Sequence, residues 1–155
     1  MRGNVSSKGI NPSISFSSAN MKTKNLDVVV IGGGQAGIAV GHELEKLFCQ
    51  YIILDKNEKV GTAWRQRYDS LRLFTSRAYC QLPGLEMKGN KSSYPTKDEM
   101  ADYLEMYAKH FELSIQNSST VTSLKKNQGK FIVEVNKDEK IIARAVIIAS
   151  GGFQI

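Results

Sequence analysis

The sequence predicts an α/β domain in which a parallel sheet carries an inserted antiparallel β-meander. Two patterns support this class. An apolar, β-branched run at residues 26–31 is followed at once by glycines and then by apolar residues at helical spacing, as in a β-α-β unit. Between residues 120 and 144 the apolar residues instead alternate with a period of two, as in antiparallel strands. The 155 residues are enough for one such domain and too few for two ordinary ones.

Residues 1–24 predict a disordered leader before a folded domain at residues 25–155. The leader is rich in serine and contains basic residues but no acidic one. Because it lacks an apolar core, a secretory signal is not expected. Its composition overlaps with that of organelle transit peptides, and a translation start at Met21 is the simpler hypothesis.

The net charge of +6 at pH 7 comes mainly from the leader, so the domain itself is nearly neutral. Its basic residues are mixed with acidic ones, which is typical of a solvated surface and gives little support for nucleic-acid binding. No apolar stretch reaches the ~18 residues of a membrane span. Cys49 and Cys80 form no C-x-x-C pair, and no cluster has metal-ligand spacing, so we expect buried thiols, no metal site and a cytoplasmic location.

Three glycines after the first strand have the G-x-G-x-x-G spacing of a dinucleotide-binding turn. Gly32 permits a sharp turn, Gly34 lets the backbone approach a pyrophosphate, and Gly37 lets helix and strand pack closely. The helix that follows is expected to bury an apolar pattern running from Ile38 to Phe48. Its N-terminus offers free N–H groups and a positive dipole end to phosphates. A flexible glycine-rich loop is the alternative, but the flanking strand and helix favour a dinucleotide.

A second strand is predicted at residues 51–54, and it ends at Asp55. This acidic residue lies about 18 residues beyond Gly37, where a carboxylate accepts hydrogen bonds from the hydroxyls of a ribose. Without the glycines, a solvated carboxylate at a strand end is the simpler interpretation. The glycine turn therefore makes Asp55 a candidate ribose ligand.

Residues 56–95 lose regular periodicity, and we expect an irregular functional excursion there. Thr96 and Glu99 then predict a capping box, with Pro95 before the cap. The helix that follows has apolar residues at helical spacing up to Phe111, which we interpret as core. Three antiparallel strands are predicted at residues 120–124, 130–135 and 140–144, and a separate buried parallel strand at residues 145–149.

Several short motifs are shared with one class of flavoprotein. They are the glycine turn at 32–37, Gly61-Thr62-Ala63-Trp64, and residues 67–73, 81–83, 94–97 and 149–153. In these motifs and in its order of parts, the chain resembles the FAD-binding part of flavin-containing monooxygenases, including their plant auxin-forming and bacterial CzcO-like branches. The group formed by Trp64, Tyr68-Asp69 and Tyr94-Pro95-Thr96 is the most specific. The resemblance covers residues 26–155 and implies a Rossmann-like FAD-binding domain.

The resemblance also implies roles for individual residues. The turn, with Gln35 and Ala36, would hold the FAD pyrophosphate. Asp55 would bind the adenosine ribose, although the family more often has Glu, so we expect weaker binding. Lys56 and Val121 would lie near the adenine. Thr62 and Trp64 would lie on the flavin and ribityl side, although Trp64 could equally be a core aromatic. Ser150 replaces the usual threonine of a turn that continues through Gly151.

By the same resemblance, FAD is the cofactor, NADPH the reductant of a full-length member, and O2 and a small molecule the substrates. The cysteine pair of related disulfide reductases is missing at residues 61–64, and we nominate no catalytic side chain. The chain ends at Ile155, before the family's F-x-G-x-x-x-H signature and its second glycine motif. We therefore expect a truncated chain that is not a competent monooxygenase alone. The alternatives are a module that works with a separate chain or self-associates through a truncated edge, and an inactive remnant.

Overall fold

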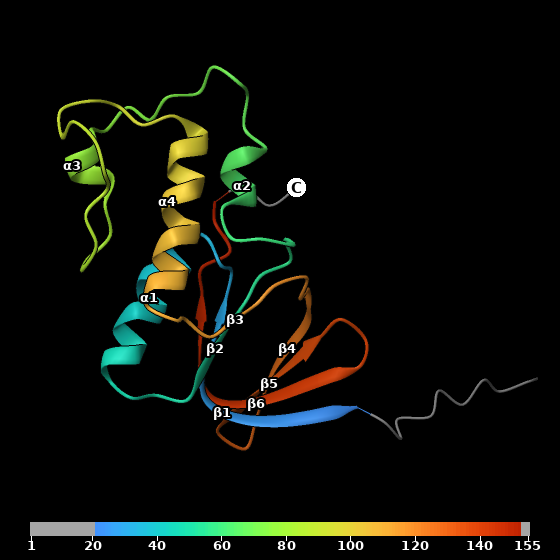
Figure 1. Ribbon diagram of the computed structural model, residues 1–155. Helices are drawn as coiled ribbons and strands as arrows, with labels where there is room; N and C mark the ends of the chain where they lie inside the picture. The colour runs from blue at the N-terminus through green and yellow to red at the C-terminus, as the bar shows by residue number, and fades with distance from the viewer. Residues whose placement is uncertain (1–20, 153–155) are drawn as a thin grey trace, which may run out of the picture.

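The computed structural model describes residues 21–152 (Figure 1). Residues 1–20 of the expected leader and the end of the last motif lie outside the described residues. The elements are β1 (Lys22–Ile31), α1 (Gln35–Lys46), β2 (Tyr51–Leu54), α2 (Thr62–Arg65), α3 (Arg77–Cys80), α4 (Lys97–His110), β3 (Ile115–Gln116), β4 (Val121–Asn127), β5 (Lys130–Val135) and β6 (Glu139–Ile148).

The strands form one sheet in the order β3-β2-β1-β6-β5-β4. β1 lies between β2 and β6 and is parallel to both, while β4, β5 and β6 form the antiparallel meander. The predicted α/β class with an inserted meander is therefore confirmed. The predicted boundary between the meander and the last parallel strand was wrong. Residues 140–144 and 145–149 were expected to form two strands, but β6 is one continuous strand that belongs to both parts of the sheet.

The first strand also begins earlier than expected. Residues 22–24, assigned to the leader, pair with the start of β6, so that Lys22 lies opposite Glu139. Sequence gave no signal for this because Lys22-Thr23-Lys24-Asn25 has no apolar residue, and its side chains are exposed. Beyond Ala143, β6 pairs with β1 on one side, and no described strand pairs with its other side. Ile148, at the end of that stretch, is 68% exposed.

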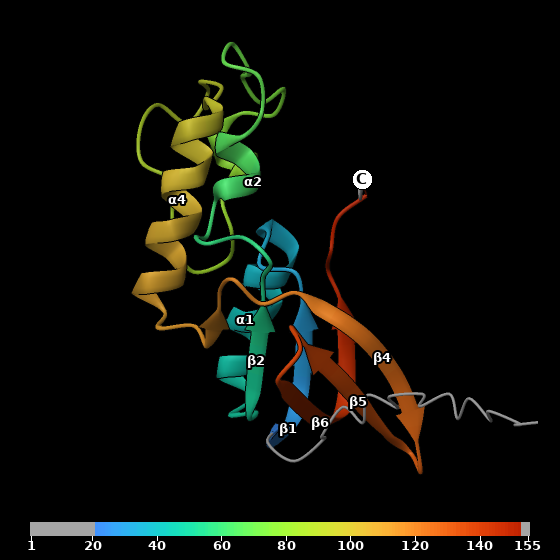
Figure 2. The same cartoon turned by 90° about the vertical axis from the view of Figure 1, so that its right-hand side faces the viewer.

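Alternate residues of β1 face two different layers. Val28 and Val30 pack with Leu44 of α1 and with Ile53 of β2. The intervening Val29 packs on the opposite face, against β5 and β6. This alternation follows from the two-residue period of a strand. Figure 2 shows the resulting layers, with α1 and α4 on one side of the parallel strands and β4 and β5 on the other.

The irregular excursion packs against one face of α4. Buried residues from α1, the excursion and α4 share one core cluster, which includes Ile38, Met87, Leu104 and Tyr107. The hydroxyl of Tyr107 donates to the carbonyl of Pro83 at 2.6 Å, and burial raises the pKa of Tyr107 to about 12. The expected core role of the α4 apolar stripe is therefore confirmed.

The ends of the two long helices show where local sequence signals succeed and fail. The predicted capping box is present, because the Thr96 side chain accepts from the Glu99 N–H and the Glu99 carboxylate accepts from the Thr96 N–H. The helix predicted from the apolar pattern up to Phe48 was longer than the observed α1. The helix ends at Lys46, Leu47 is 69% exposed, and Phe48 is 95% exposed with a φ of 52°.

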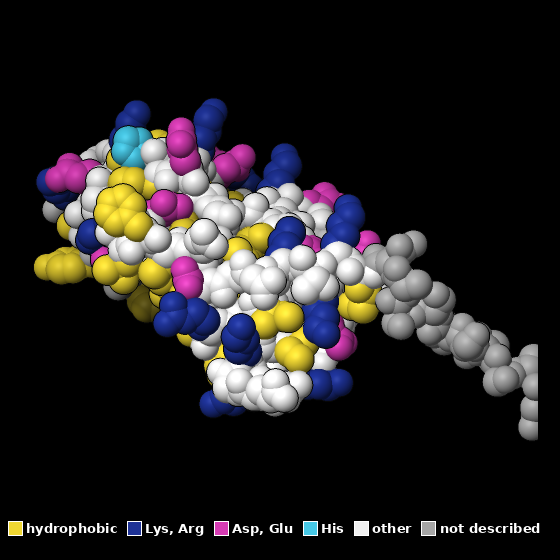
Figure 3. Space-filling model, turned by 90° about the horizontal axis from the view of Figure 1, so that it is seen from below, with side chains coloured by type: hydrophobic (Ala, Val, Ile, Leu, Met, Phe, Trp, Pro, Cys, Tyr) yellow, Lys and Arg dark blue, Asp and Glu magenta, His cyan; other side chains and the backbone are white. Residues whose placement is uncertain are grey.

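Figure 3 views the molecule from below, at the end of the sheet remote from α2. Lys and Arg side chains are spread over this face with Asp and Glu side chains among them. Ion pairs also join strands of the sheet: Lys24 of β1 pairs with Glu139 of β6, and Arg144 of β6 pairs with Asp27 of β1. Within residues 21–152, no helix is both long and apolar enough to cross a membrane.

Candidate dinucleotide-binding site

A cleft of about 720 Å³ lies at the carboxyl ends of β1, β2 and β6. This edge is where ligands bind in open parallel sheets, and the volume is within the usual range for a small-molecule site. All but one of the predicted cofactor-binding residues line the cleft. They are Gly32, Gly34, Gln35, Ala36, Asp55, Lys56, Thr62, Trp64, Val121, Ser150 and Gly151.

The glycine turn forms the floor of the cleft. Gly32 has a φ of +109°, and a Cβ there would lie 2.4 Å from the Ala149 carbonyl oxygen, so only glycine fits between the ends of β1 and β6. Gly34 is the N-cap of α1, and a Cβ there would meet no atom within 4 Å because the residue borders open space. Gly37 is the predicted residue outside the cleft lining. It is buried, and a Cβ would lie 1.9 Å from the Gly32 carbonyl oxygen, which explains the close contact between turn and helix.

The N-terminus of α1 opens into the cleft at Gln35 and Ala36. Backbone N–H groups in a first helical turn have no partner within the helix, and the helix dipole adds a partial positive charge there. Lys56, Lys59 and Arg67 also line the cleft and are exposed. The floor of the cleft is therefore suited to bind a diphosphate.

Asp55 is 8% exposed, and its carboxylate holds the glycine turn to the segment after β2. Oδ2 accepts from the Gly33 N–H at 2.6 Å, and Oδ1 accepts from the Asn57 N–H at 2.7 Å. A carboxylate oxygen has a second lone pair, so both oxygens can still accept a bond from a ligand in the cleft. Sequence reasoning missed the role of Gly33. A Cβ there would lie 2.8 Å from Asp55 Oδ2, so the extra glycine between Gly32 and Gly34 was the available signal.

The wall opposite the turn is α2, which supplies Thr62, Ala63 and Trp64. Gly61, the N-cap of α2, has a φ of +83°, and a Cβ there would lie 2.8 Å from the Ala101 carbonyl oxygen. This contact places α2 directly on α4. Trp64 also packs against the core cluster under α4, so it is a partly buried core aromatic and a residue of the cleft at the same time.

The remaining predicted residues come from the start of β4 and from the segment after β6. Val121 starts β4 and reaches the cleft together with Ser119 and Thr120, which the sequence did not identify. The Ser119 N–H donates to the Asp55 carbonyl at 2.8 Å, and this bond fixes the loop at the end of β2. Ser150 and Gly151 follow β6, and Gly151 has a φ of +86°. Among residues 21–152, no group of His, Cys, Asp or Glu could hold a metal ion.

Comparison with known proteins identifies the family. Residues 29–155 match the pyridine nucleotide-disulphide oxidoreductase family. The chain is 45% identical over 127 residues to "Uncharacterized oxidoreductase CzcO" of Bacillus velezensis, which covers 82% of the chain and 36% of that protein. It is 37% identical over 98 residues to "Probable indole-3-pyruvate monooxygenase YUCCA7" of Arabidopsis thaliana, which covers 63% of the chain and 23% of that protein.

Among solved structures, the flavin-containing monooxygenase from Stenotrophomonas maltophilia superposes with a TM-score of 0.78 at 33% identity, covering 83% of the chain and 39% of that structure. The chain thus spans just over a third of the length of the curated CzcO relative. The chain belongs to the pyridine nucleotide-disulphide oxidoreductase family, and it corresponds to the N-terminal part of the flavin-containing monooxygenase-like members.

Proposed function

We propose that the cleft binds FAD and that the chain is the FAD-binding part of an NAD(P)H-dependent flavin monooxygenase or oxidoreductase. The observation that carries this proposal is the convergence of three features on one cleft: the glycine turn with the α1 N-terminus, the Asp55 carboxylate, and the α2 wall with Trp64. A dinucleotide needs all three, because it has a charged diphosphate, a ribose with paired hydroxyls, and an aromatic ring at each end.

The site residues divide along that ligand. The diphosphate would lie over Gly32, Gly34 and the N–H groups of Gln35 and Ala36. Asp55 would accept from the adenosine ribose, with Lys56 and Val121 beside the adenine. Thr62 and Trp64 would contact the flavin and ribityl side, and Ser150 and Gly151 would close the cleft from the end of β6.

Bound FAD would supply the redox chemistry, which passes electrons from NAD(P)H to O2 and a small-molecule substrate. The residues of this chain contribute binding and orientation. The carboxylate of Asp55 and the amides of the turn would fix the adenosine diphosphate half, and Thr62 and Trp64 of α2 would flank the other half. The full activity, its substrate and its reductant site are proposals for the whole protein, since the chain spans 36% of the CzcO relative.

Calorimetric titration of the purified chain with FAD, FMN and NADP tests this proposal. We expect FAD to bind more tightly than FMN, which lacks the adenosine diphosphate that the turn and Asp55 hold. NADP should bind more weakly than FAD, because its 2′-phosphate would meet the Asp55 carboxylate. Equal affinity for FAD and FMN, or no heat with FAD, would contradict the assignment.

The same titration separates the alternatives. An FAD-binding module that works with a separate chain would bind FAD by itself, whereas an inactive remnant would not. The exposed side of β6 beyond Ala143 is our candidate surface for such a chain or for self-association. Light scattering of the FAD-loaded chain would then distinguish a monomer from a self-associated form.

A further inference from the structure

Lys97 is a buried lysine outside the cleft, and its side chain binds the end of α2 and the segment that follows it. The residue is 7% exposed, although it occupies the first position of α4. Its Nζ donates to the carbonyl oxygens of Arg65 at 3.0 Å and Arg67 at 2.8 Å, and to Asp69 Oδ1 at 3.0 Å. These bonds use all three N–H donors of the ammonium group.

Two general rules disfavour a lysine at this position. Lysine is almost never fully buried unless it is paired, and a cation at a helix N-terminus opposes the helix dipole. The acidic residues of the same first turn, Asp98 and Glu99, offset part of that second effect. Lys97 meets the first rule only through its bonds to Arg65, Arg67 and Asp69. Its unfavourable place at the helix N-terminus therefore indicates a specific requirement elsewhere in the structure.

The target of Lys97 is the end of the α2 wall. Arg65 is the last residue of α2, so its carbonyl is one of the terminal groups that lack a partner within the helix. Arg67 directly follows the C-cap Gln66, so its carbonyl belongs to the segment that leaves α2. Because α2 has four residues, it cannot hold its own conformation. Cleft residues lie directly on this short segment, from Thr62 and Trp64 to Arg67.

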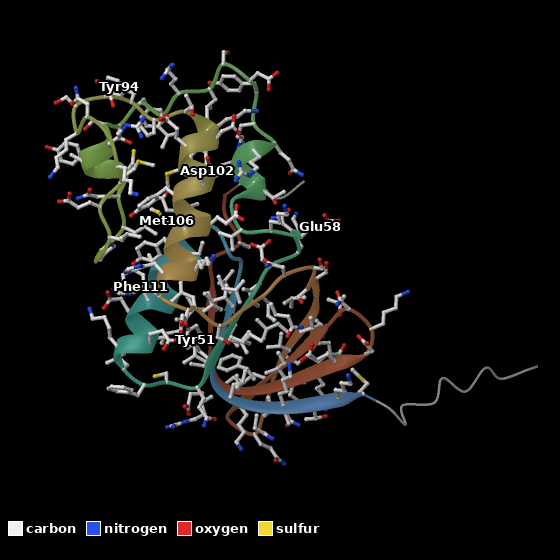
Figure 4. The ribbon with its side chains drawn as sticks, viewed as in Figure 1. Tyr51, Glu58, Tyr94, Asp102, Met106 and Phe111 are labelled. Atoms are coloured by element: carbon white, nitrogen blue, oxygen red, sulfur yellow. The ribbon has the colours of Figure 1, made fainter. Side chains whose placement is uncertain are left out.

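Other contacts from α4 hold α2 from the same side. Gly61 at the start of α2 lies against Ala101, one helical turn after Lys97. The Arg65 guanidinium pairs with Asp102 at 2.6 Å and Glu105 at 3.1 Å, and Figure 4 shows Asp102 between α4 and α2. These ion pairs are exposed, and such pairs contribute little to stability. Lys97 is the buried anchor of the set.

We propose that Lys97 is a positioning residue for the cofactor cleft, which holds α2 so that Trp64 faces the flavin side of the site. The expected effect of Lys97 on FAD affinity rests on the proposed FAD function, whereas its expected effect on the position of α2 does not. The two main-chain carbonyls carry the effect, because Asp69 has a fully exposed side chain. The motif Tyr94-Pro95-Thr96-Lys97 thereby acquires a physical role: it starts α4 at Thr96 and ties it to α2 through Lys97.

Trp64 is the only tryptophan of the chain, so its fluorescence reports the position of α2 directly. The test compares wild type with Lys97→Met, which keeps the aliphatic stem, and with Lys97→Gln, which keeps two N–H donors. Lys109→Met is the matched control, because Lys109 is an exposed lysine in the last turn of the same helix. Asp69→Asn tests whether the charge of the Asp69 carboxylate helps Lys97 to hold α2.

The first measurement is acrylamide quenching of Trp64 without FAD. We expect at least a twofold higher quenching constant in Lys97→Met, a smaller increase in Lys97→Gln, and wild-type values in Lys109→Met and Asp69→Asn. Far-UV circular dichroism should stay unchanged in all of them. Wild-type quenching in Lys97→Met would overturn the proposal whether or not the chain binds FAD. Failure of both Lys97 variants to fold would overturn it too, because Lys97 would then support the whole fold rather than α2.

The second measurement is FAD affinity. We expect at least tenfold weaker binding in Lys97→Met, partial recovery in Lys97→Gln, and less than a twofold change in the two other variants. Wild-type affinity in a Lys97→Met chain with exposed Trp64 would overturn the link between α2 and the cofactor. If wild type itself does not bind FAD, the proposed function fails while the quenching result still decides the role of Lys97.

Discussion

Substitution of Gly34 by alanine should separate cofactor binding from folding. Gly34 has a φ of −76° and a ψ of −172°, which an alanine adopts without strain, and an added Cβ meets no atom within 4 Å. Alanine lowers the conformational entropy of the unfolded chain, which should stabilise the variant by roughly 0.4–1 kcal/mol. Alanine is a poorer N-cap than glycine, which costs on the order of 0.5–1 kcal/mol. The two terms oppose each other and leave the free energy of unfolding within about 1 kcal/mol of wild type.

The added methyl group has a different effect on the ligand. It would stand in the open space over the α1 N-terminus, where a diphosphate has to approach the backbone. We expect FAD affinity to fall at least tenfold, or about 1.4 kcal/mol. Thermal unfolding followed by circular dichroism, together with calorimetric titration with FAD, measures both quantities. A change of about 1 kcal/mol shifts Tm by roughly 2–4 °C in a chain of this size.

Gly37→Ala is the contrasting variant. Its Cβ would lie 1.9 Å from the backbone oxygen of Gly32, so turn and helix would have to separate. Overpacking of this kind costs on the order of 1–3 kcal/mol, and Tm should fall by several degrees. Full FAD affinity in Gly34→Ala would refute the placement of the diphosphate, and a Gly34→Ala chain less stable than Gly37→Ala would refute the steric reasoning.

Three further predictions concern stability. Asp55→Ala leaves the Gly33 and Asn57 N–H groups without their acceptor, which should cost on the order of 2–4 kcal/mol in urea unfolding, and Asp55→Asn should cost less because one oxygen remains. Thr96→Ala removes the cap of α4 and should cost roughly 1 kcal/mol, seen as a lower Tm. The Thr96 N–H, followed by Arg77, lowers the pKa of Glu99. The stabilisation that ionised Glu99 contributes is therefore fully present above its unfolded pKa of about 4.3 and is lost as the pH falls through its folded pKa. Glu99→Gln should remove this pH dependence and flatten that part of the acid unfolding curve.

The β-α-β unit and the glycine turn were predictable because each signal is local. Apolar alternation, glycine spacing and a capping box depend on residues a few positions apart, and each survives in the structure. The strand at Lys22–Asn25 was not predictable, since its pairing partner is more than 100 residues away at the start of β6. The exposed Phe48 was missed for a related reason: the positive φ that ends α1 leaves no mark in its apolar residue type.

The candidate site likewise combines residues that local spacing predicts with contacts between distant segments that it does not. Gly32, Gly34 and Asp55 follow from motif spacing, and the structure places them in one cleft. The bond between Gly33 and Asp55 and the reach of Lys97 to α2 depend on how distant segments meet, so spacing could not reveal them. Trp64 is the intermediate case. Its residue type allowed a core or a ligand role, and its position at the edge of the core cluster serves both.

The most direct test of the FAD site is the fluorescence of Trp64 during titration with FAD, followed by addition of ADP. Trp64 and the glycine turn line the same cleft, so we predict saturable quenching by FAD that excess ADP reverses through competition for the turn and Asp55. Absence of saturable quenching, or quenching that excess ADP leaves unchanged, would contradict an FAD site in this cleft.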